Sequence, residues 1–161
     1  MTFLCASIFV DAAEDVPLAL ERARGAVEAG ARLIEWRLDA LAEENDGLQL
    51  ILALLEESPA PAIATIRGEG EGGTWVGDEA DRVAIVEAMG TSASPPRYID
   101  VELGAWGSSA NLRQKVLLAI EHEHQVRDVA SGLILSSHEF AGRPANLTAR
   151  LAGMVEVDAC A

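Results

Sequence analysis

A short apolar segment followed by a longer amphipathic one recurs about every 30 residues, and this repeat constrains the fold most. Short apolar runs at 3–10, 33–39, 62–67, 98–103 and 132–137 predict strands. Periodic segments at 16–29, 46–57, 78–89, 111–124 and 145–155 predict helices. Five consecutive strand-then-helix units indicate an α/β protein with a parallel sheet and crossover helices.

This spacing is shared by an open doubly wound sheet and by a closed barrel. A dinucleotide-binding sheet carries GxGxxG after its first strand, whereas residues 10–14 read VDAAE and place acids where a pyrophosphate would bind. The first apolar run has no polar face, so we expect that strand to be buried on both sides.

Composition removes several classes of function. Half of the 161 residues are apolar, enough for a sizeable core, and 12 basic against 26 acidic residues give a net charge of −14, which repels nucleic acid. Cys5 and Cys160 lie at opposite ends of the chain without metal-binding spacing, so no metal site is expected. The first apolar run is too short for a signal peptide or a membrane span, so we expect a cytoplasmic protein without membrane partners.

Charged residues and one histidine gather where the predicted strands end. They are Glu35, Arg37, Asp39, Arg67, Asp100, Glu102 and His138. The carboxyl ends of parallel strands meet at one edge of a sheet, so these side chains should lie together. Such a cluster fits a structural ion-pair network and a polar binding site equally well.

The glycine-rich segment 67–73, RGEGEGG, has two acids and no lysine, which argues against a phosphate-binding loop. We expect a mobile flap whose glycines let Arg67 and Glu71 project into the same site. His138 follows a strand end, where an imidazole that titrates near neutrality could act as both acid and base.

Five segments, in order along the chain, resemble one known family. They are LCASI at 4–8, EWRLD at 35–39, TIR at 65–67 with EGG at 71–73, YIDVEL at 98–103, and SSHEF at 136–140. Together they resemble the type I 3-dehydroquinate dehydratases of the shikimate pathway. The resemblance implies a (β/α)8 barrel, here a single incomplete domain of about five βα units over residues 1–161. It also implies dehydration of the small molecule 3-dehydroquinate to 3-dehydroshikimate through a lysine Schiff base, without metal or cofactor.

The resemblance assigns a role to each matching residue. His138 takes the place of the general base that later serves as the acid for the leaving hydroxyl, and Glu71 that of the glutamate that orients it. Glu35, Arg37 and Arg67 match residues that hold the substrate. Asp100 resembles an acid behind the site that pairs with an arginine.

The resemblance also implies a Schiff-base lysine at the end of a sixth strand, and the 161 residues stop near the start of that strand. The one lysine present, Lys115, falls on a predicted crossover helix that would face away from the barrel mouth. We therefore expect the 161-residue chain to be poorly stable and inactive alone. Either the protein continues, or the 161 residues are an expressed or ordered portion of it, or a second copy completes the chain as a homodimer; we favour the first two.

Two other functions remain open. The chain could be a non-catalytic remnant that binds a polyhydroxylated carboxylate, or the charged cluster could be a structural network in another parallel α/β protein. A long distance between Glu71 and His138 would favour the structural network.

Overall fold

The computed structural model describes residues 3–127 and 131–156, with side chains described up to residue 121 in the helix that ends at 127. Its five strands form one parallel sheet: β1 (Cys5–Phe9), β2 (Leu33–Arg37), β3 (Ala62–Thr65), β4 (Tyr98–Glu102) and β5 (Gly132–Ser136). Their order in the sheet is their order in the chain. A doubly wound sheet reverses its strand order at a switch point, whereas a barrel does not, so the topology favours the barrel.

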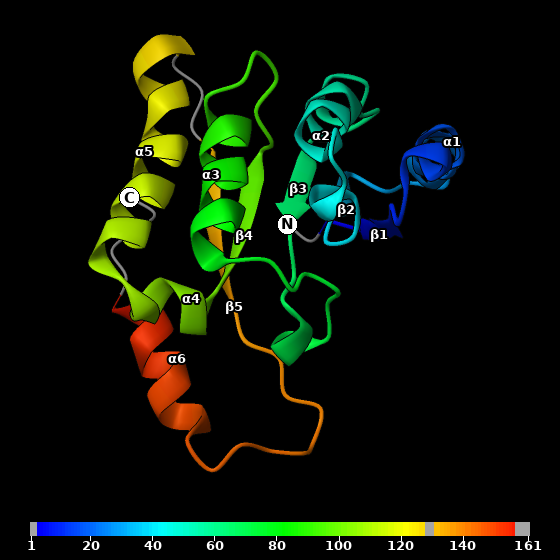
Figure 1. The fold of residues 1–161 in the computed structure, drawn as a ribbon. Helices are drawn as coiled ribbons and strands as arrows, with labels where there is room; N and C mark the ends of the chain where they lie inside the picture. Colours follow the sequence, from blue (N-terminus) through cyan, green and yellow to red (C-terminus); the bar gives the residue numbers. More distant parts are fainter. Residues whose placement is uncertain (1–2, 128–130, 157–161) are drawn as a thin grey trace.

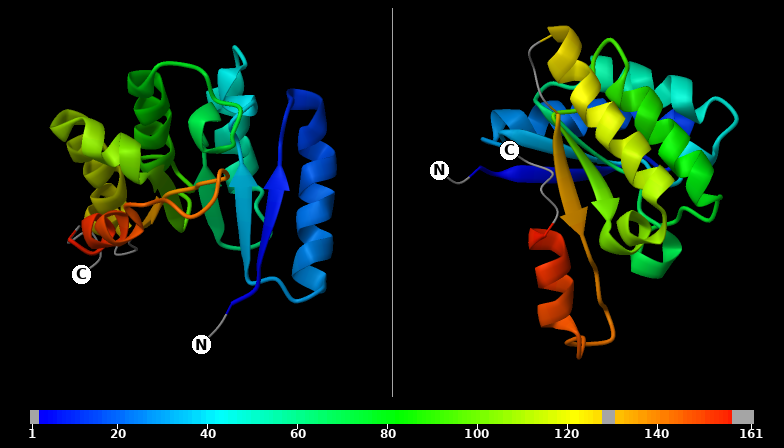
Figure 2. Two further views of the ribbon diagram at one scale, coloured as in Figure 1. Left: turned by 90° about the horizontal axis from the view of Figure 1, so that it is seen from below. Right: turned by 90° about the vertical axis from the view of Figure 1, so that its left-hand side faces the viewer.

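The crossover helices are α1 (Val16–Glu28), α2 (Gly47–Glu56), α3 (Glu79–Gly90) and α5 (Ala110–Arg127). They lie on one side of the sheet (Figures 1 and 2). The strand side chains that face them form the core, and Ile34, Trp36 and Ile99 are fully buried there. The sequence-based bounds of these elements are confirmed to within a few residues, because local periodicity determines them.

Three 3-10 turns, Ala13–Asp15, Leu41–Glu43 and Glu69–Glu71, and the short helix α4 (Leu103–Ser108) were not predicted. Residues 103–108 read LGAWGS and have no helical periodicity. Trp106 is nevertheless buried, so packing rather than local pattern stabilises this turn of helix.

The prediction that the first strand is buried on both sides was wrong. Ile8 points toward the helices and is buried, whereas Cys5, Ser7 and Phe9 are exposed on the other face. In a closed barrel that inner face is covered by side chains from the opposite strands. The five described strands leave it open.

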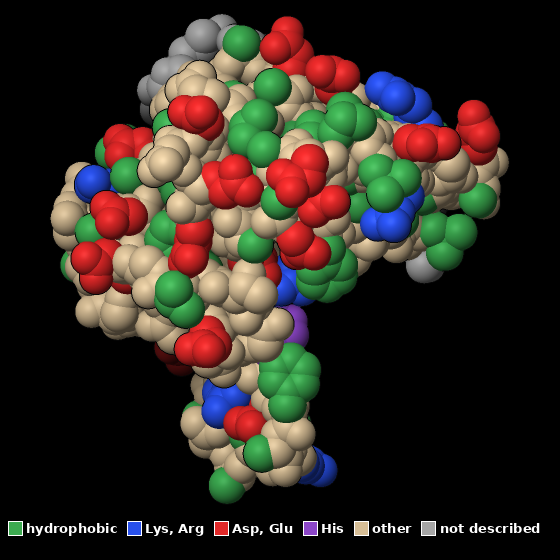
Figure 3. Space-filling view, turned by 45° about the vertical axis from the view of Figure 1, so that its right-hand side comes forward, with side chains coloured by type: hydrophobic (Ala, Val, Ile, Leu, Met, Phe, Trp, Pro, Cys, Tyr) green, Lys and Arg blue, Asp and Glu red, His purple; other side chains and the backbone are tan. Residues whose placement is uncertain are grey.

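Helix α6 (Leu147–Val155) follows β5 and stands away from the sheet (Figures 1 and 3). None of its residues is buried, and Leu147, Leu151 and Val155 form an exposed apolar stripe at helical spacing. Acidic side chains are spread over the face of the main body seen above it in Figure 3. Within the described residues, no helix combines the length and hydropathy that a bilayer crossing requires.

Candidate active site

Arg67, just after β3, is the centre of the charged cluster and is only 4% exposed. Its Nη2 lies 2.8 Å from Oδ1 of Asp100 on β4, and its Nη1 donates to Ser136 Oγ on β5 at 2.5 Å. Ser136 Oγ in turn donates to the same Asp100 oxygen at 2.8 Å. The three strand ends are thus joined by one buried, charge-assisted network.

Burial raises the pKa of the Asp100 carboxyl above its ordinary value. The charge of Arg67 and the hydrogen bond from Ser136 offset this only in part, and the nearby charge of Glu35 adds to the increase. The predicted pairing of Asp100 with an arginine is confirmed by the 2.8 Å contact with Arg67. Its place behind the reacting groups stays a proposal.

Asp39, which follows β2, connects the two arginines of the predicted site. It is 3% exposed and pairs with Arg37, whose Nη2 lies 2.6 Å and Nε 3.2 Å from its two oxygens. The same carboxylate accepts the backbone N–H of Arg67 at 2.8 Å. Arg37 also stacks over the ring of Phe9, with 4.7 Å between the guanidinium carbon and the ring centroid.

Glu35 lies deeper on the inner face, in the middle of β2. One oxygen accepts Thr65 Oγ1 at 2.9 Å, and the other accepts the hydroxyl of Ser7 on β1. Ser7 of β1 lies in register with Glu35. Thr65 of β3 lies two residues beyond Ile63, the register partner of Glu35 on that strand. Glu35 and Arg37 therefore share the open inner face of the sheet.

The glycine-rich loop folds back on itself after Arg67. Gly72 adopts a left-handed conformation with φ of 81°, and a Cβ on Gly73 would lie 1.9 Å from the Arg67 carbonyl oxygen, so only glycine fits there. This fold brings Glu71 back to within 3.9 Å of the Arg67 guanidinium. The prediction that both side chains project into one site is confirmed, and the mobility of the loop stays a prediction.

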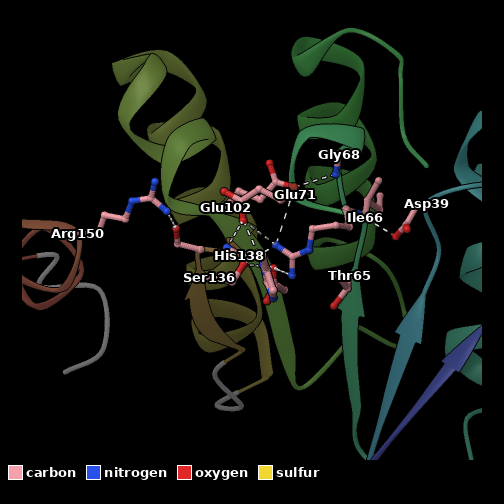
Figure 4. Close-up of polar contacts among 12 residues, drawn as sticks. Asp39, Thr65, Ile66, Gly68, Glu71, Glu102, Ser136, His138 and Arg150 are labelled. Atoms are coloured by element: carbon pink, nitrogen blue, oxygen red, sulfur yellow. Dashed lines mark hydrogen bonds and ion pairs between the residues drawn. The ribbon is translucent and has the colours of Figure 1, made fainter. Parts of the chain in front are cut away.

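Glu71 and His138 form the contact on which the acid-base interpretation depends. Glu71 Oε2 accepts the backbone N–H of His138 at 2.8 Å and lies 3.1 Å from its ring Nδ1. The His138 side chain is 41% exposed, so the imidazole can reach a ligand. A long distance between these two residues would have favoured the structural-network alternative, but they are in contact (Figure 4).

A cleft of about 550 Å³ adjoins this pair. It lies between the glycine-rich loop, the start of α4 and the segment from β5 into α6, and its charged wall includes Glu139 and Arg150. Arg150 reaches back from α6 to Ser137 Oγ at 3.1 Å and to Glu139 at 3.5 Å.

Lys115 lies far from this site. It is on α5, in the outer helical layer, where its Nζ is 3.8 Å from Glu87 of α3 and its side chain is 39% exposed. The prediction that it faces away from the strand ends agrees with this placement. Cys5 is a free and largely exposed thiol, and its partial burial and the charge of Glu35 raise its pKa. Cys160 lies outside the described residues.

Sequence reasoning gave no role to several residues of the network. Ser136 could have been found from the alternation along β5, which places it on the inner face beside Asp100. Glu102 was noted only as a charged residue at a strand end, and Arg82 of α3 carried no signal because a single arginine on a helix normally faces water. Glu102 accepts the backbone N–H of Gly68, and Arg82 donates to the carbonyl oxygen of Ile66, so both contact the start of the glycine-rich loop.

A sequential parallel sheet with a histidine–glutamate pair and paired arginines at its strand ends is the arrangement expected of part of a (β/α)8 barrel, whose functional groups lie at the carboxyl ends of the strands. A sequence model of one family, described as type I 3-dehydroquinase, matches residues 4–160. The chain therefore belongs to the type I 3-dehydroquinase family, and the predicted family and barrel fold are confirmed.

Individual relatives agree. The 3-dehydroquinate dehydratase of Methanosarcina acetivorans is 33% identical over 144 residues, which cover 87% of this chain and 56% of the relative. That of Methanothermobacter thermautotrophicus is 32% identical over 143 residues, covering 89% of this chain and 55% of the relative. The chain thus spans about half the length of the curated relatives it matches.

Solved structures show the same fold. A type I 3-dehydroquinate dehydratase from Clostridium difficile superposes with a TM-score of 0.76 at 22% identity, covering 98% of this chain and 60% of that one. The enzyme from Geobacillus kaustophilus gives 0.68 at 25% identity, covering 92% and 55%. In both, the described sheet corresponds to part of a longer chain.

Proposed function

We propose that this chain forms the acid-base and substrate-holding part of a 3-dehydroquinate dehydratase, which removes water from 3-dehydroquinate to give 3-dehydroshikimate. The observation that carries the proposal is the contact between Glu71 and His138 at the edge of the cleft. Family membership supports the assignment. A cytoplasmic location and a homodimer remain predictions.

The Glu71–His138 contact suits proton transfer. A carboxylate 3.1 Å from Nδ1 favours the tautomer that carries its proton on Nδ1. Nε2 then keeps its lone pair and can take the proton from the carbon next to the ketone. The imidazolium so formed can return that proton to the departing hydroxyl, so the one residue serves as base and then as acid.

The inner-face cluster supports substrate holding. Glu35, Arg37 and Arg67 offer an acceptor and two cationic donors, which match the hydroxyl groups of a polyhydroxylated ring. Because Asp39 and Asp100 hold the arginines at 2.6–2.8 Å, these donors are positioned before a ligand arrives.

Schiff-base chemistry needs an amine at the strand ends, and Lys115 is in the outer layer. We propose that this amine comes from outside the 161 residues, on the part of the barrel that covers the remaining length of the relatives. The 161-residue chain alone should then give no measurable enone product from 3-dehydroquinate.

The test is a chimaera that joins this chain to the C-terminal part of the Methanosarcina acetivorans relative, assayed by the absorbance of the enone product. We expect dehydration, with a loss of about 10²–10⁴-fold in kcat for Glu71→Gln and His138→Gln. Glu69→Gln, an exposed acid in the same loop, is the matched control and should keep full activity. Undiminished turnover by the His138→Gln chimaera would contradict the proposal.

Because the one lysine of the 161 residues lies in the outer helical layer, a second function stays open, a binding module without catalysis. Calorimetric titration of the folded chimaera with 3-dehydroquinate distinguishes the two. Binding without turnover supports the binding module, whereas binding with turnover supports the enzyme.

A further inference from the structure

We propose that Arg82 and Glu102 are positioning residues for His138, acting through the start of the glycine-rich loop. The catalytic part of this inference rests on the proposed function, because it concerns what holds Glu71 and His138 in place. The contacts run from the outer helical layer to the strand ends in four steps, through Glu102, Gly68, Glu71 and finally His138.

The first step is the burial of Arg82. This residue of α3 is 7% exposed, and its Nη1 donates to the carbonyl oxygen of Ile66 at 3.0 Å and lies 3.1 Å from Glu102 Oε1. Its Nη2 pairs with Glu79 of the same helix at 2.7 Å. A buried guanidinium is costly unless all its contacts are made, so Arg82 holds Glu102 in one place.

The second step is the bond from the backbone of Gly68 to Glu102. Glu102 Oε1 accepts the Gly68 N–H at 2.7 Å. Burial raises the pKa of Glu102, but the hydrogen bonds from Arg82 and Gly68 and the charges of Arg82 and Arg67 outweigh it, so the pKa lies below its ordinary value. The carboxylate is therefore ionised near neutral pH and is a strong acceptor for this N–H.

The third step passes through the carbonyl group of Gly68. It accepts the N–H of Glu71 and the N–H of Gly73, both at 3.0 Å, and so closes the turn that carries Glu71. The fourth step is the pair of contacts from Glu71 Oε2 to His138. In Figure 4, Glu71 and Glu102 converge on Ser136 and His138, which both come from the end of β5.

Electrostatics gives an independent reason for the same role. Arg67 Nη1 lies between two carboxylates, 3.8 Å from Glu102 and 3.9 Å from Glu71. While Glu102 is present, it shares the attraction of this guanidinium. Without Glu102, Asp100 stays the closest partner of the guanidinium at 2.8 Å, and the attraction that Glu102 shared falls more strongly on Glu71, which would weaken the contact of Glu71 with His138.

The test uses the 161-residue chain and two NMR readouts of His138, the hydrogen exchange of its backbone amide and the nitrogen shifts of its ring. We expect Glu102→Ala to increase exchange of the His138 amide by at least about tenfold relative to core amides. We also expect the ring shifts to move from the Nδ1–H tautomer toward those of free imidazole. Glu102→Gln keeps an oxygen for Gly68 and should recover part of both effects, and it replaces Glu102→Ala should that variant not fold.

Glu79→Gln is the matched control, because it removes the other carboxylate of Arg82 and leaves the bond to Gly68 in place. A purely structural role would lower the unfolding temperature in Glu102 and Glu79 variants alike without moving the ring shifts of folded His138. Unchanged exchange and unchanged ring shifts in both folded Glu102 variants would overturn the proposal. The readouts need no turnover, so failure of the chimaera to dehydrate 3-dehydroquinate would count against the proposed function alone.

Discussion

Replacing Asp39 by alanine removes three hydrogen bonds at once, two from Arg37 and one from the backbone of Arg67. The orphaned N–H of Arg67 is buried, and such a group costs about 1–3 kcal/mol. The loss of the ion pair adds about 1–2 kcal/mol. This cost lies between the costs of breaking an exposed and a buried ion pair, because the Arg37 side chain is 15% exposed and can turn toward water. We expect Asp39→Ala to cost about 2–5 kcal/mol in total.

Asp39→Asn separates these two contributions. Its amide oxygen can still accept the Arg67 N–H, so only the ionic part, about 1–2 kcal/mol, should be lost. With a urea m-value of about 2 kcal/mol/M, the midpoint should fall by about 1–2.5 M for alanine and by about 0.5–1 M for asparagine.

The assay is equilibrium urea unfolding followed by tryptophan fluorescence, which reports on the fully buried Trp36. Asp11→Ala, which removes an exposed acid next to β1, controls for the change in net charge. Equal midpoints for the alanine and asparagine variants would refute the reasoning, because the Arg67 N–H would then not depend on Asp39.

Three further predictions follow from the structure. The pKa of Glu102 is lowered in the folded protein. The stabilisation from its carboxylate is therefore complete above the ordinary glutamate pKa of about 4.3 and is lost as pH falls through the lower folded value. The loss in unfolding temperature caused by Glu102→Gln should be largest near neutral pH and shrink below about pH 4. Gly73→Ala should lower the free energy of unfolding by roughly 1–3 kcal/mol in thermal unfolding, because the added Cβ meets the Arg67 carbonyl oxygen. Gly70→Ala adds a Cβ with nothing within 4 Å and should change stability by less than about 0.5 kcal/mol. Equal losses in the two variants would contradict this prediction. Leu151→Glu on the exposed stripe of α6 should reduce binding of a hydrophobic dye while changing stability by less than about 0.5 kcal/mol, and a large destabilisation in urea unfolding would show that this face is covered.

Much of the site could be predicted because each strand end carries its own polar residues. The alternation in EWRLD placed Glu35 and Arg37 on one face, and the structure keeps them there. The contact between Glu71 and His138 joins residues 67 positions apart, and no periodicity encodes such a distance. It was expected only from the resemblance to a family whose barrel brings these loops together.

The sequence alone determined the number, type and order of the main elements, because strand and helix periodicities are local properties of the chain. Tertiary structure decided which faces are covered. Ser7 and Phe9 are exposed because no strand of the described residues lies opposite them, and Arg82 is buried because α3 packs it against Ile66 and Glu102. A side chain's partners depend on which distant segments the fold brings beside it, and so the link from Arg82 to His138 could be found only in three dimensions.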